Sequence, residues 1–536
     1  MKALILDGYV DEPALLGVPP YISPEPRLLA GVLEEAGIGW DYITVDEYRK
    51  TGLPPVDMLI VHGGVTVPGK YLGGTPLSLR ECLELGQKSS MNGIETFLGG
   101  PLARFEKIEN YHHVSTKDLS AYLTDHFKGE SRDRWATMDE RERWLQMGVS
   151  VVEKHPLFPD PLLAEIGTYR GCVRYFTGGC SFCSEPGYGK PEFREQSDVI
   201  DEISALYGLG IRHFRLGGQS CIISYKSEGI GESERPVPRP GELKSLFAGI
   251  DKRCPDIKVL HVDNANPSVM AAHPKEAERI LEILVKYTTA GNVLALGMES
   301  ADPRVIEEND LNARPEEVER AIRMINDVGA ITGNNGMPKL LPGLNFLAGL
   351  KGESSETYEI DLAFLKDILD SSLLLRRINI RQVLSHRSDF NMEFPKEFKH
   401  FKARVREEID RPMLKKMLPQ GTVLKDVYME KHQGNLTFGR QIGTYPLLVG
   451  VEYTLELGEY YDVIITEHGY RSVTGIHHPF FIDKASFTEL KAIPGVGKKR
   501  AAKIFRAKPS NEQELMAVLN DPEIVKEILK YAEFSI

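Results

Sequence analysis

Short apolar runs that stop at glycine alternate with amphipathic stretches along residues 1–105. The pattern of a buried parallel strand is found in "KALILDG", "VDMLIVHGG" and "IETFLGG". Helical spacing with a glycine stop is found between the first two runs, in "PRLLAGVLEEAG". The alternation predicts a Rossmann-like, doubly wound α/β domain at 1–105, with a ligand crevice at the strand ends.

The same alternation returns at 161–400, after a polar, charge-dense connector at 106–160. Helical stretches separate the strand candidates, which are "AEIGTY", "HFRLGG", "VLHVDN", "VLALGMES", "GLNFLAGL" and "RINIRQV". Repeated βα units of this kind predict a full or partial (β/α) barrel. Chemistry in such barrels takes place at the C-terminal ends of the strands, where polar residues and glycines cluster in this chain.

Two further segments have a different character. Residues 419–475 are rich in β-branched and aromatic residues and are broken by glycines, which predicts a small β-barrel. Residues 485–536 have helical patterns, with "AIPGVGKKRAAKIF" at their centre. We therefore expect an α/β chain built from an N-terminal doubly wound domain, a (β/α) barrel, a small β-barrel and a C-terminal helical domain.

Composition and charge limit the classes of protein. The chain has 536 residues, of which 42% are hydrophobic and 26% charged, as in ordinary globular proteins. Its net charge of -12 excludes a general polycation, so nucleic-acid contact needs a local basic patch. The start, "MKALILDGYV", lacks signal-peptide features, and no run approaches the roughly 18 apolar residues of a membrane span. These observations predict a cytoplasmic protein without a membrane partner, whose clustered cysteines serve a metal or catalysis.

Half of the six cysteines lie on one glycine-rich loop after the first barrel strand. Cys172, Cys180 and Cys183 have the spacing C-x7-C-x2-C. Soft thiolates suit an iron–sulfur cluster or zinc, but structural zinc normally takes four ligands. The nearest histidines, His155 and His213, are many residues away. We therefore expect a cluster with one iron open to a further ligand; three buried free cysteines are the alternative.

The motif "RGC…GGCSFC" resembles the cluster loop of radical S-adenosylmethionine (radical SAM) enzymes. The resemblance implies a [4Fe-4S] cluster held by the three cysteines, with SAM on the fourth iron. It also implies cleavage of SAM to a radical that abstracts hydrogen from a substrate carbon. Phe182 matches the family's aromatic residue between the last two cysteines. The first spacing departs from the commonest family pattern, because seven residues stand where that pattern has three.

Later strand ends match the family's SAM-binding motifs. In "LGGQS", Gly217, Gly218 and Gln219 match the motif that holds the SAM amino group. The segment "LGMESADPRVI" resembles the motif of the fourth strand, which implies that Glu299 and Ser300 contact the SAM ribose or carboxylate.

Three further residues are weaker candidates. Arg381 follows a late strand and would pair with the SAM carboxylate, or is a surface arginine. Asp263 and Asn264 follow "VLHV" and would contact the ribose or the substrate. The segment "NFLAGLKGESSETYE" resembles one found in the branch that includes methylthiotransferases and cobalamin-type radical enzymes.

The two segments that follow the predicted (β/α) barrel resemble RNA-binding modules. Residues 419–475 resemble the TRAM domain, which binds RNA in methylthiotransferases; a purely structural barrel is the alternative. The stretch 421–475 has four basic and seven acidic residues, a poor electrostatic footprint for RNA.

The segment "IPGVGKKRAAKI" resembles a helix–hairpin–helix, whose glycines bring backbone amides to a phosphate at a helix start. Gly495 and Gly497 are the glycines of this motif, and Lys498, Lys499 and Arg500 follow them. The stretch 491–508 has seven basic residues and no acidic ones. The resemblance implies contact with RNA phosphates, and a protein-binding helical module is the alternative.

The first domain resembles the cobalamin-binding or methylthiotransferase N-terminal domains that precede many radical SAM barrels. A second cluster is not expected, because Cys82 is the only cysteine before the barrel. The histidine signature of base-off cobalamin binding is absent from "LDGYVDEPALLG". Cobalamin stays a candidate cofactor, because some radical SAM methylases bind it without that histidine.

The leading hypothesis is a radical SAM enzyme, a transferase that cleaves SAM and functionalises a C–H bond of tRNA or rRNA. It would take electrons from a donor such as ferredoxin or flavodoxin. One alternative is a cobalamin-dependent radical SAM methylase acting on a small molecule or a protein. Another is a non-catalytic nucleic-acid-binding protein.

Overall fold

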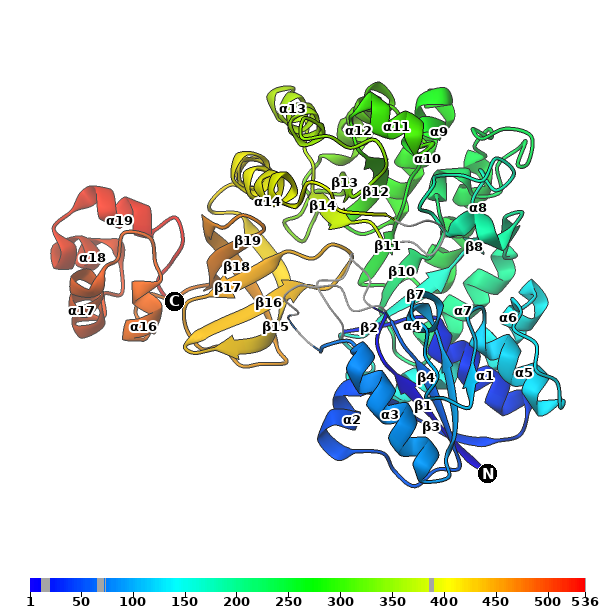
Figure 1. Ribbon diagram of the computed structural model, residues 1–536. Coiled ribbons are helices and arrows are strands. Elements are labelled where there is room, and N and C mark those ends of the chain that lie inside the picture. Colours follow the sequence, from blue (N-terminus) through cyan, green and yellow to red (C-terminus); the bar gives the residue numbers. More distant parts are fainter. Residues whose placement is uncertain (11–19, 65–71, 73, 385–389, 536) are drawn as a thin grey trace.

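The computed structural model describes residues 1–10, 20–64, 72, 74–384 and 390–535 of the chain. Figure 1 shows an N-terminal α/β module, a large module of parallel strands and outer helices, a small β-barrel and a group of C-terminal helices beyond it. The α/β fold class predicted from the sequence, with these component parts, is confirmed.

The N-terminal sheet is parallel throughout, in the order β3-β1-β4-β5-β6. Its strands are β1 Lys2–Asp7, β3 Gly39–Thr44, β4 Met58–His62, β5 Glu95–Gly99 and β6 His113–Val114, and its helices are α1 Glu25–Glu35, α2 Val45–Thr51, α3 Leu79–Met91 and α4 Pro101–Phe105. Ala3 and Ile5 of β1 share an apolar core with α1, whereas Leu4 and Leu6 share one with α3. Helices therefore cover both faces, as in a doubly wound sheet.

The large module is an open parallel barrel. Its strands are β7 Leu163–Gly167, β10 His213–Gly217, β11 Val259–Val262, β12 Asn292–Glu299, β13 Leu340–Ala348 and β14 Arg377–Gln382, at all the predicted strand positions. A parallel bridge between Ala265 and Leu296 joins the β7–β11 sheet to the β12–β14 sheet. On its open side, β2 (Tyr21–Ile22) leaves the N-terminal module and pairs with β7.

Helices cover the outside of the barrel (Figure 1). They are α7 Gln196–Gly208, α8 Pro240–Arg253, α9 Pro267–Ala272, α10 Pro274–Tyr287, α11 Pro303–Glu308, α12 Pro315–Gly329, α13 Thr357–Asp370 and α14 Pro395–Arg404, followed by a π-helix, η5, at Val405–Asp410. The next helix, α15 Arg411–Met417, packs on η5 and on the small barrel. Short 3-10 helices are η2 Val149–Lys154, η3 Glu185–Tyr188 and η4 Ile222–Ser224. None of the described helices combines the length and the apolar composition that crossing a bilayer requires.

The segment 106–160, expected as a connector, contains α5 Leu119–Phe127 and α6 Met138–Met147. Both helices pack on α1, and their apolar residues join the core that α1 shares with the barrel. This segment is therefore a packed part of the join between the N-terminal module and the barrel.

The small barrel is closed, in the order β15-β16-β17-β19-β18. Its strands are β15 Val423–Gln433, β16 Leu436–Gln441, β17 Leu448–Val451, β18 Tyr460–His468 and β19 Ser472–His478, and the C-terminal helices are α16 Phe487–Lys491, α17 Lys498–Ala507, α18 Glu512–Leu519 and α19 Pro522–Ile528. Val463 of the barrel and Ile504 and Ile528 of the helices belong to one apolar core. The barrel and the C-terminal helices are therefore packed as one unit.

A buried histidine of the large barrel forms a contact with the small barrel. The Nδ1 atom of His261, on β11, accepts a hydrogen bond from the backbone N–H of Thr444 at 3.0 Å. Gly443 packs flat on the same ring, since a Cβ atom there would lie 2.6 Å from the His261 Cε1 atom. Arg376 adds a second contact, donating to the Tyr445 carbonyl at 2.7 Å.

Mild acid is expected to loosen this contact. Burial lowers the pKa of His261 from 6.5 to about 4, so the folded chain favours the neutral ring. The contribution of the ring is complete above pH 6.5. It is lost as the pH falls toward the folded pKa, at a cost of about 2 kcal/mol by about pH 5. We expect His261→Asn to lose less unfolding free energy than the wild type between neutral pH and that pH, measured by urea unfolding. Equal losses in both proteins would contradict this role.

Candidate active site

The three clustered cysteines lie between β8 (Tyr169–Arg170) and β9 (Glu192–Phe193), which pair as an antiparallel hairpin just after β7. Cys172, Cys180 and Cys183 are each partly exposed. Burial raises the pKa of the Cys183 thiol to about 12, and charge interactions with Cys172 and Glu299 add to the effect. The same kinds of interaction raise the pKa of Cys180. The thiols and the Glu299 carboxyl are therefore within range of electrostatic interaction.

Arg174 lies among the sulfur atoms. Its Nη1 atom donates to Cys180 Sγ at 3.3 Å, and its backbone N–H donates to Cys172 Sγ at 3.5 Å. Its guanidinium is almost fully buried and is held by Asp310 at 2.9 Å and Glu234 at 3.2 Å. A fixed positive charge beside the thiols favours their anionic form, which is the form that binds metal. The sequence analysis missed Arg174, whose only signal is its place two residues after Cys172.

Asn309 anchors the cysteine loop to the barrel. Its carbonyl accepts from the Ser181 N–H at 3.0 Å, and its side-chain oxygen accepts from the Ser181 hydroxyl at 2.9 Å. Its amide also donates to the Lys351 carbonyl at 2.8 Å, in the turn after β13. Phe182 packs beside Cys180 on an apolar cluster of the barrel that includes Val383. No sequence motif pointed to Asn309, because its partners are far away along the chain.

The turn at 217–219 closes β10 beside the cysteine loop. A Cβ atom at Gly217 would lie 3.0 Å from the Glu165 carboxyl carbon and 3.1 Å from the Arg215 guanidinium, so a larger residue would push these side chains aside. Gly218 has a φ of +75°. Gln219 is buried, and its amide donates to the Leu216 carbonyl at 2.8 Å, which holds the turn in shape.

The adjoining residue joins this turn to the cluster loop. The hydroxyl of Ser220 donates to the carbonyl of Gly171, the residue before Cys172, at 2.9 Å. The turn and the thiols therefore occupy the same end of the barrel.

Glu299 ends β12 at a break in the strand register between Gly297 and Glu299. Its φ is +61°, a conformation that costs a residue with a Cβ atom free energy and that often marks functional positions. Burial raises the pKa of its carboxyl from 4.5 to about 8. The Glu299 side chain is partly exposed, so a ligand can reach its carboxyl and form a hydrogen bond with it.

The other predicted SAM contacts differ in their surroundings. The Ser300 hydroxyl donates to Asp361 at 3.0 Å and accepts from the Asp302 N–H at 3.1 Å, so it is engaged within the fold. Arg381, on β14, is partly exposed and forms no ion pair with another residue that the structure describes. Asp263 forms a buried ion pair with Arg215, and Asn264 donates to the Gln219 carbonyl at 3.1 Å. The SAM-binding roles of these residues stay predictions.

The donor set suits an iron–sulfur cluster with an open position. One partly exposed loop supplies the three thiols, and Arg174 donates to two of the sulfurs, those of Cys172 and Cys180. Within the described part of the chain, the remaining cysteines are buried; the Sγ atom of Cys221 accepts a hydrogen bond from the Asn266 N–H at 3.1 Å. Three ligands on a [4Fe-4S] cluster leave one iron for another molecule.

A cleft of about 280 Å³ separates the carboxyl edge of the N-terminal sheet from the barrel. Its walls include His62 at the end of β4, Gly218 of the turn and Glu185 just after the cysteine loop. Ligands of open parallel sheets bind at this edge of the strands. The cleft therefore connects the crevice predicted for the first domain with the thiol end of the barrel.

Several buried polar atoms of this cleft have no partner among the described residues. They are both ring nitrogens of His62, the Glu185 Oε2 atom and the Arg170 Nη1 atom. His62 is 4% exposed, and burial lowers its pKa. Burial also raises the pKa of Glu25, another wall residue, to about 7. Buried polar atoms without partners favour a polar ligand or water in the cleft.

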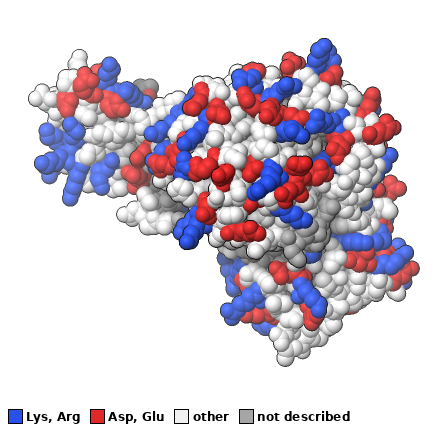
Figure 2. Space-filling model, turned by 45° about the horizontal axis from the view of Figure 1, so that its top comes forward, with Lys and Arg blue, Asp and Glu red and all other residues white. Residues whose placement is uncertain are grey.

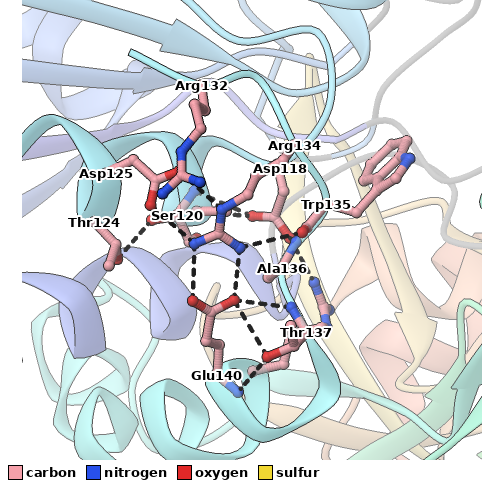
Figure 3. A network of polar contacts seen from close by, with 12 residues as sticks. Asp118, Ser120, Thr124, Asp125, Arg132, Arg134, Trp135, Ala136, Thr137 and Glu140 are labelled. Carbon is pink, nitrogen blue, oxygen red and sulfur yellow. Dashed lines mark hydrogen bonds and ion pairs between the residues drawn. The ribbon is translucent and has the colours of Figure 1, made fainter. Parts of the chain in front are cut away.

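The 106–160 segment builds one wall of the cleft through a network of ion pairs (Figure 3). Arg134 lies between two carboxylates, with its Nε atom 2.8 Å from Asp125 and its Nη1 atom 2.7 Å from Glu140. Asp118 begins α5 by accepting from the Ser120 N–H at 3.1 Å and pairs with Arg141 at 3.3 Å. These contacts fix the wall residues Asp118 and Arg141 in place.

The predicted phosphate-binding residues lie at the start of α17. Gly495 has a φ of +77°, and Gly497 precedes the first turn of the helix. Lys498 and Lys499 are exposed, and Figure 2 shows blue side chains gathered on the outer side of the C-terminal helices. Arg500 instead donates to the Gly495 carbonyl at 3.0 Å and pairs with Asp521 at 2.9 Å. The contacts of these residues with RNA stay predictions.

Comparison with known proteins gives close and distant relatives. No protein-family model matches the chain. The uncharacterized protein MJ0274 of Methanocaldococcus jannaschii is 44% identical over 508 residues, which cover 88% of this chain and 93% of that protein. The tRNA-2-methylthio-N(6)-dimethylallyladenosine synthase of Prosthecochloris aestuarii is 22% identical over 299 residues, 55% of either chain.

Among solved structures, one similar protein is the radical SAM methyltransferase TsrM from Kitasatospora setae, bound to tryptophan and a SAM analogue. The match has a TM-score of 0.47 and 15% sequence identity. It covers 71% of this chain and 72% of the other.

Proposed function

We propose that this chain, which belongs to the same family as MJ0274 of Methanocaldococcus jannaschii, is a radical SAM enzyme that holds a [4Fe-4S] cluster on Cys172, Cys180 and Cys183. The observation that carries the proposal is the meeting of the thiol loop, the 217–219 turn and Glu299 at one end of the barrel. When bound, the cluster supplies the electron that cleaves SAM.

The chain's own residues would prepare this chemistry in distinct ways. Arg174 offsets the negative charge of the thiolates. Gly217 and Gly218 leave room for the backbone of the turn to approach the ligand, and Gln219 holds that turn. The partly exposed carboxyl of Glu299 would bind a ligand hydroxyl such as those of the SAM ribose.

Glu299→Ala tests the SAM pocket. We expect it to retain its iron after anaerobic reconstitution but to bind SAM about 1–3 kcal/mol more weakly, because a hydrogen bond to the ligand is lost. SAM affinity and the release of 5′-deoxyadenosine under reducing conditions are the measurements. Glu282→Ala is the matched control, since Glu282 is exposed on α10. Unchanged SAM affinity in Glu299→Ala would place the pocket elsewhere.

RNA is the substrate class that we infer for the enzyme. The support is the basic stretch at 491–508 and the exposure of Lys498, Lys499 and Lys503 on α17. The distant relative from Prosthecochloris aestuarii has a tRNA modification in its name. Contacts of this type position a polynucleotide without reading its sequence, so the target nucleotide would be chosen in the cleft.

The cleft also supports a second candidate, a cobalamin-dependent radical SAM methylase. The observation in its favour is His62, which is buried at the carboxyl edge of the N-terminal sheet and has no hydrogen-bond partner among the residues that the structure describes. Cobalt analysis of protein produced anaerobically with added hydroxocobalamin separates the two. About one cobalt per chain, lost in His62→Ala, would favour the methylase, and a cobalt-free protein that modifies RNA would exclude it.

A further inference from the structure

Glu95, His113 and His126 meet at the edge of the N-terminal sheet that lies away from β3. Glu95 begins β5, His113 begins the edge strand β6, and His126 lies in the last turn of α5. We propose that these three side chains bind one divalent transition-metal ion, and that Zn²⁺ is the ion their donor atoms favour. Two imidazoles and a carboxylate form one of the donor sets found in protein zinc sites.

The donor atoms already have the spacing of metal ligands. The candidate ligand atoms of the three residues all lie within 4.8 Å of one another. The Glu95 Oε1 atom is 3.0 Å from His113 Nε2 and 3.3 Å from His126 Nε2. Zinc bonds of about 2.0–2.1 Å in a tetrahedron place neighbouring ligand atoms about 3.3–3.4 Å apart. An ion can therefore replace the hydrogen bonds with only small side-chain shifts.

The surroundings orient the imidazole rings. His113 Nδ1 lies 3.2 Å from the Tyr122 hydroxyl, which can accept the ring's second N–H when Nε2 binds the ion. The Phe97 ring stacks on His113 at 4.4 Å and meets the edge of His126 at 5.0 Å. Hydrogen bonding of the distal nitrogen is a regular feature of metal-bound histidines.

The site is open on one side. The side chains of His113 and His126 are 21% and 24% exposed, and that of Glu95 is 38% exposed. Water can therefore reach the ion and serve as the fourth ligand. The donor atoms belong to the N-terminal module and the 106–160 segment, whereas the thiol loop belongs to the barrel, so the proposal is independent of the cluster.

A bound ion would stabilise the edge of the N-terminal sheet. The edge strand β6 has only two residues paired with β5. By contrast, the end of α5 is firmly held, because Arg134 clamps Asp125, the neighbour of His126, through hydrogen bonds of 2.8 and 3.0 Å (Figure 3). A bound ion would tie β5 and β6 to this fixed helix end.

The test uses a full-length chain in which Cys172, Cys180 and Cys183 are alanine, because these thiols would themselves bind zinc. After removal of metal by a chelator, we expect a Zn²⁺ titration to show close to one tight site per chain. His126→Asn in this background should weaken zinc binding at least about 100-fold, since a direct ligand is lost. Tyr122→Phe should weaken it about 10–100-fold, as loss of a hydrogen bond to a metal-bound histidine does.

His112→Asn is the matched control. His112 neighbours His113 in the chain, but its Nδ1 atom lies 2.9 Å from the Thr96 hydroxyl, outside the group. The His112→Asn substitution should leave the zinc affinity unchanged. Circular dichroism checks folding, and Glu95→Gln, which keeps the side-chain shape, serves where His126→Asn does not fold. The proposal would be overturned if the chain with the three cysteines replaced had no tight zinc site. It would also be overturned if folded His126→Asn or Glu95→Gln bound zinc as tightly as that chain.

Discussion

Replacing Cys172, Cys180 and Cys183 together with alanine is expected to abolish iron binding after anaerobic reconstitution and, with it, the cleavage of SAM. The physical reason is that thiolates are the cluster's only protein ligands in the proposal, and the Arg174 guanidinium cannot replace them. The wild type should bind close to one [4Fe-4S] cluster per chain. Iron and sulfide analysis, together with the absorbance of the cluster, measures the difference.

Cysteines elsewhere serve as matched controls for this experiment. Cys82 is buried in the N-terminal module, where its sulfur lies 3.4 Å from the Tyr111 hydroxyl. Cys254, at the end of α8, is also buried. Alanine at either position should leave the iron content alone. Full iron retention in the triple variant would refute the assignment of the ligands.

Neutralising Lys498, Lys499 and Lys503 is expected to weaken RNA binding without affecting SAM cleavage in the absence of RNA. These side chains are exposed on α17, so their loss removes charge but little packing. Each phosphate contact releases counterions on binding, so the slope of log affinity against log salt should fall by up to about three units. Filter binding of tRNA over a salt series measures the slope.

The design of the lysine variant follows from the structure. Arg500 is retained, because it pairs with Asp521 inside the helical group. Neutralising Lys244 and Lys252, exposed on α8, together with Lys275, exposed on α10, removes the same three charges away from the C-terminal helices and serves as the control. An unchanged salt slope in the α17 variant would point to a protein-binding role for these helices. Truncation after Asp483 is a poorer test, because Phe480 and Ile482 share a core with α19.

Local patterns made much of the fold predictable. Barrel strands such as β10 and β12 are apolar runs with distinctive residues at their ends, and these ends carry the turn at 217–219 and Glu299. The thiols are close together in sequence, so their spacing alone predicted a shared site. Periodicity within a short window was sufficient for these features.

Contacts between distant segments were not predictable in this way. The strand β2 has two residues, too few for a pattern, and its partner β7 lies far along the chain. Folding brings the cysteine loop to Asn309 and makes His62 a wall of the cleft, and neither role can be read from neighbouring residues in the sequence. The segment 106–160 looked like a polar connector because many of its charges pair with each other, as Arg134 does with Asp125 and Glu140.

The core shared by the small barrel and the C-terminal helices has a consequence for substrate choice. Because His261 and Arg376 also fasten the small barrel to the large one, the basic surface of α17 stands at a set distance from the thiol loop. If α17 binds the phosphates of an RNA, only nucleotides at a fixed distance from those phosphates can reach the cleft. The protein would then select a modification site first by its distance from the bound phosphates, and only afterwards by the identity of the base.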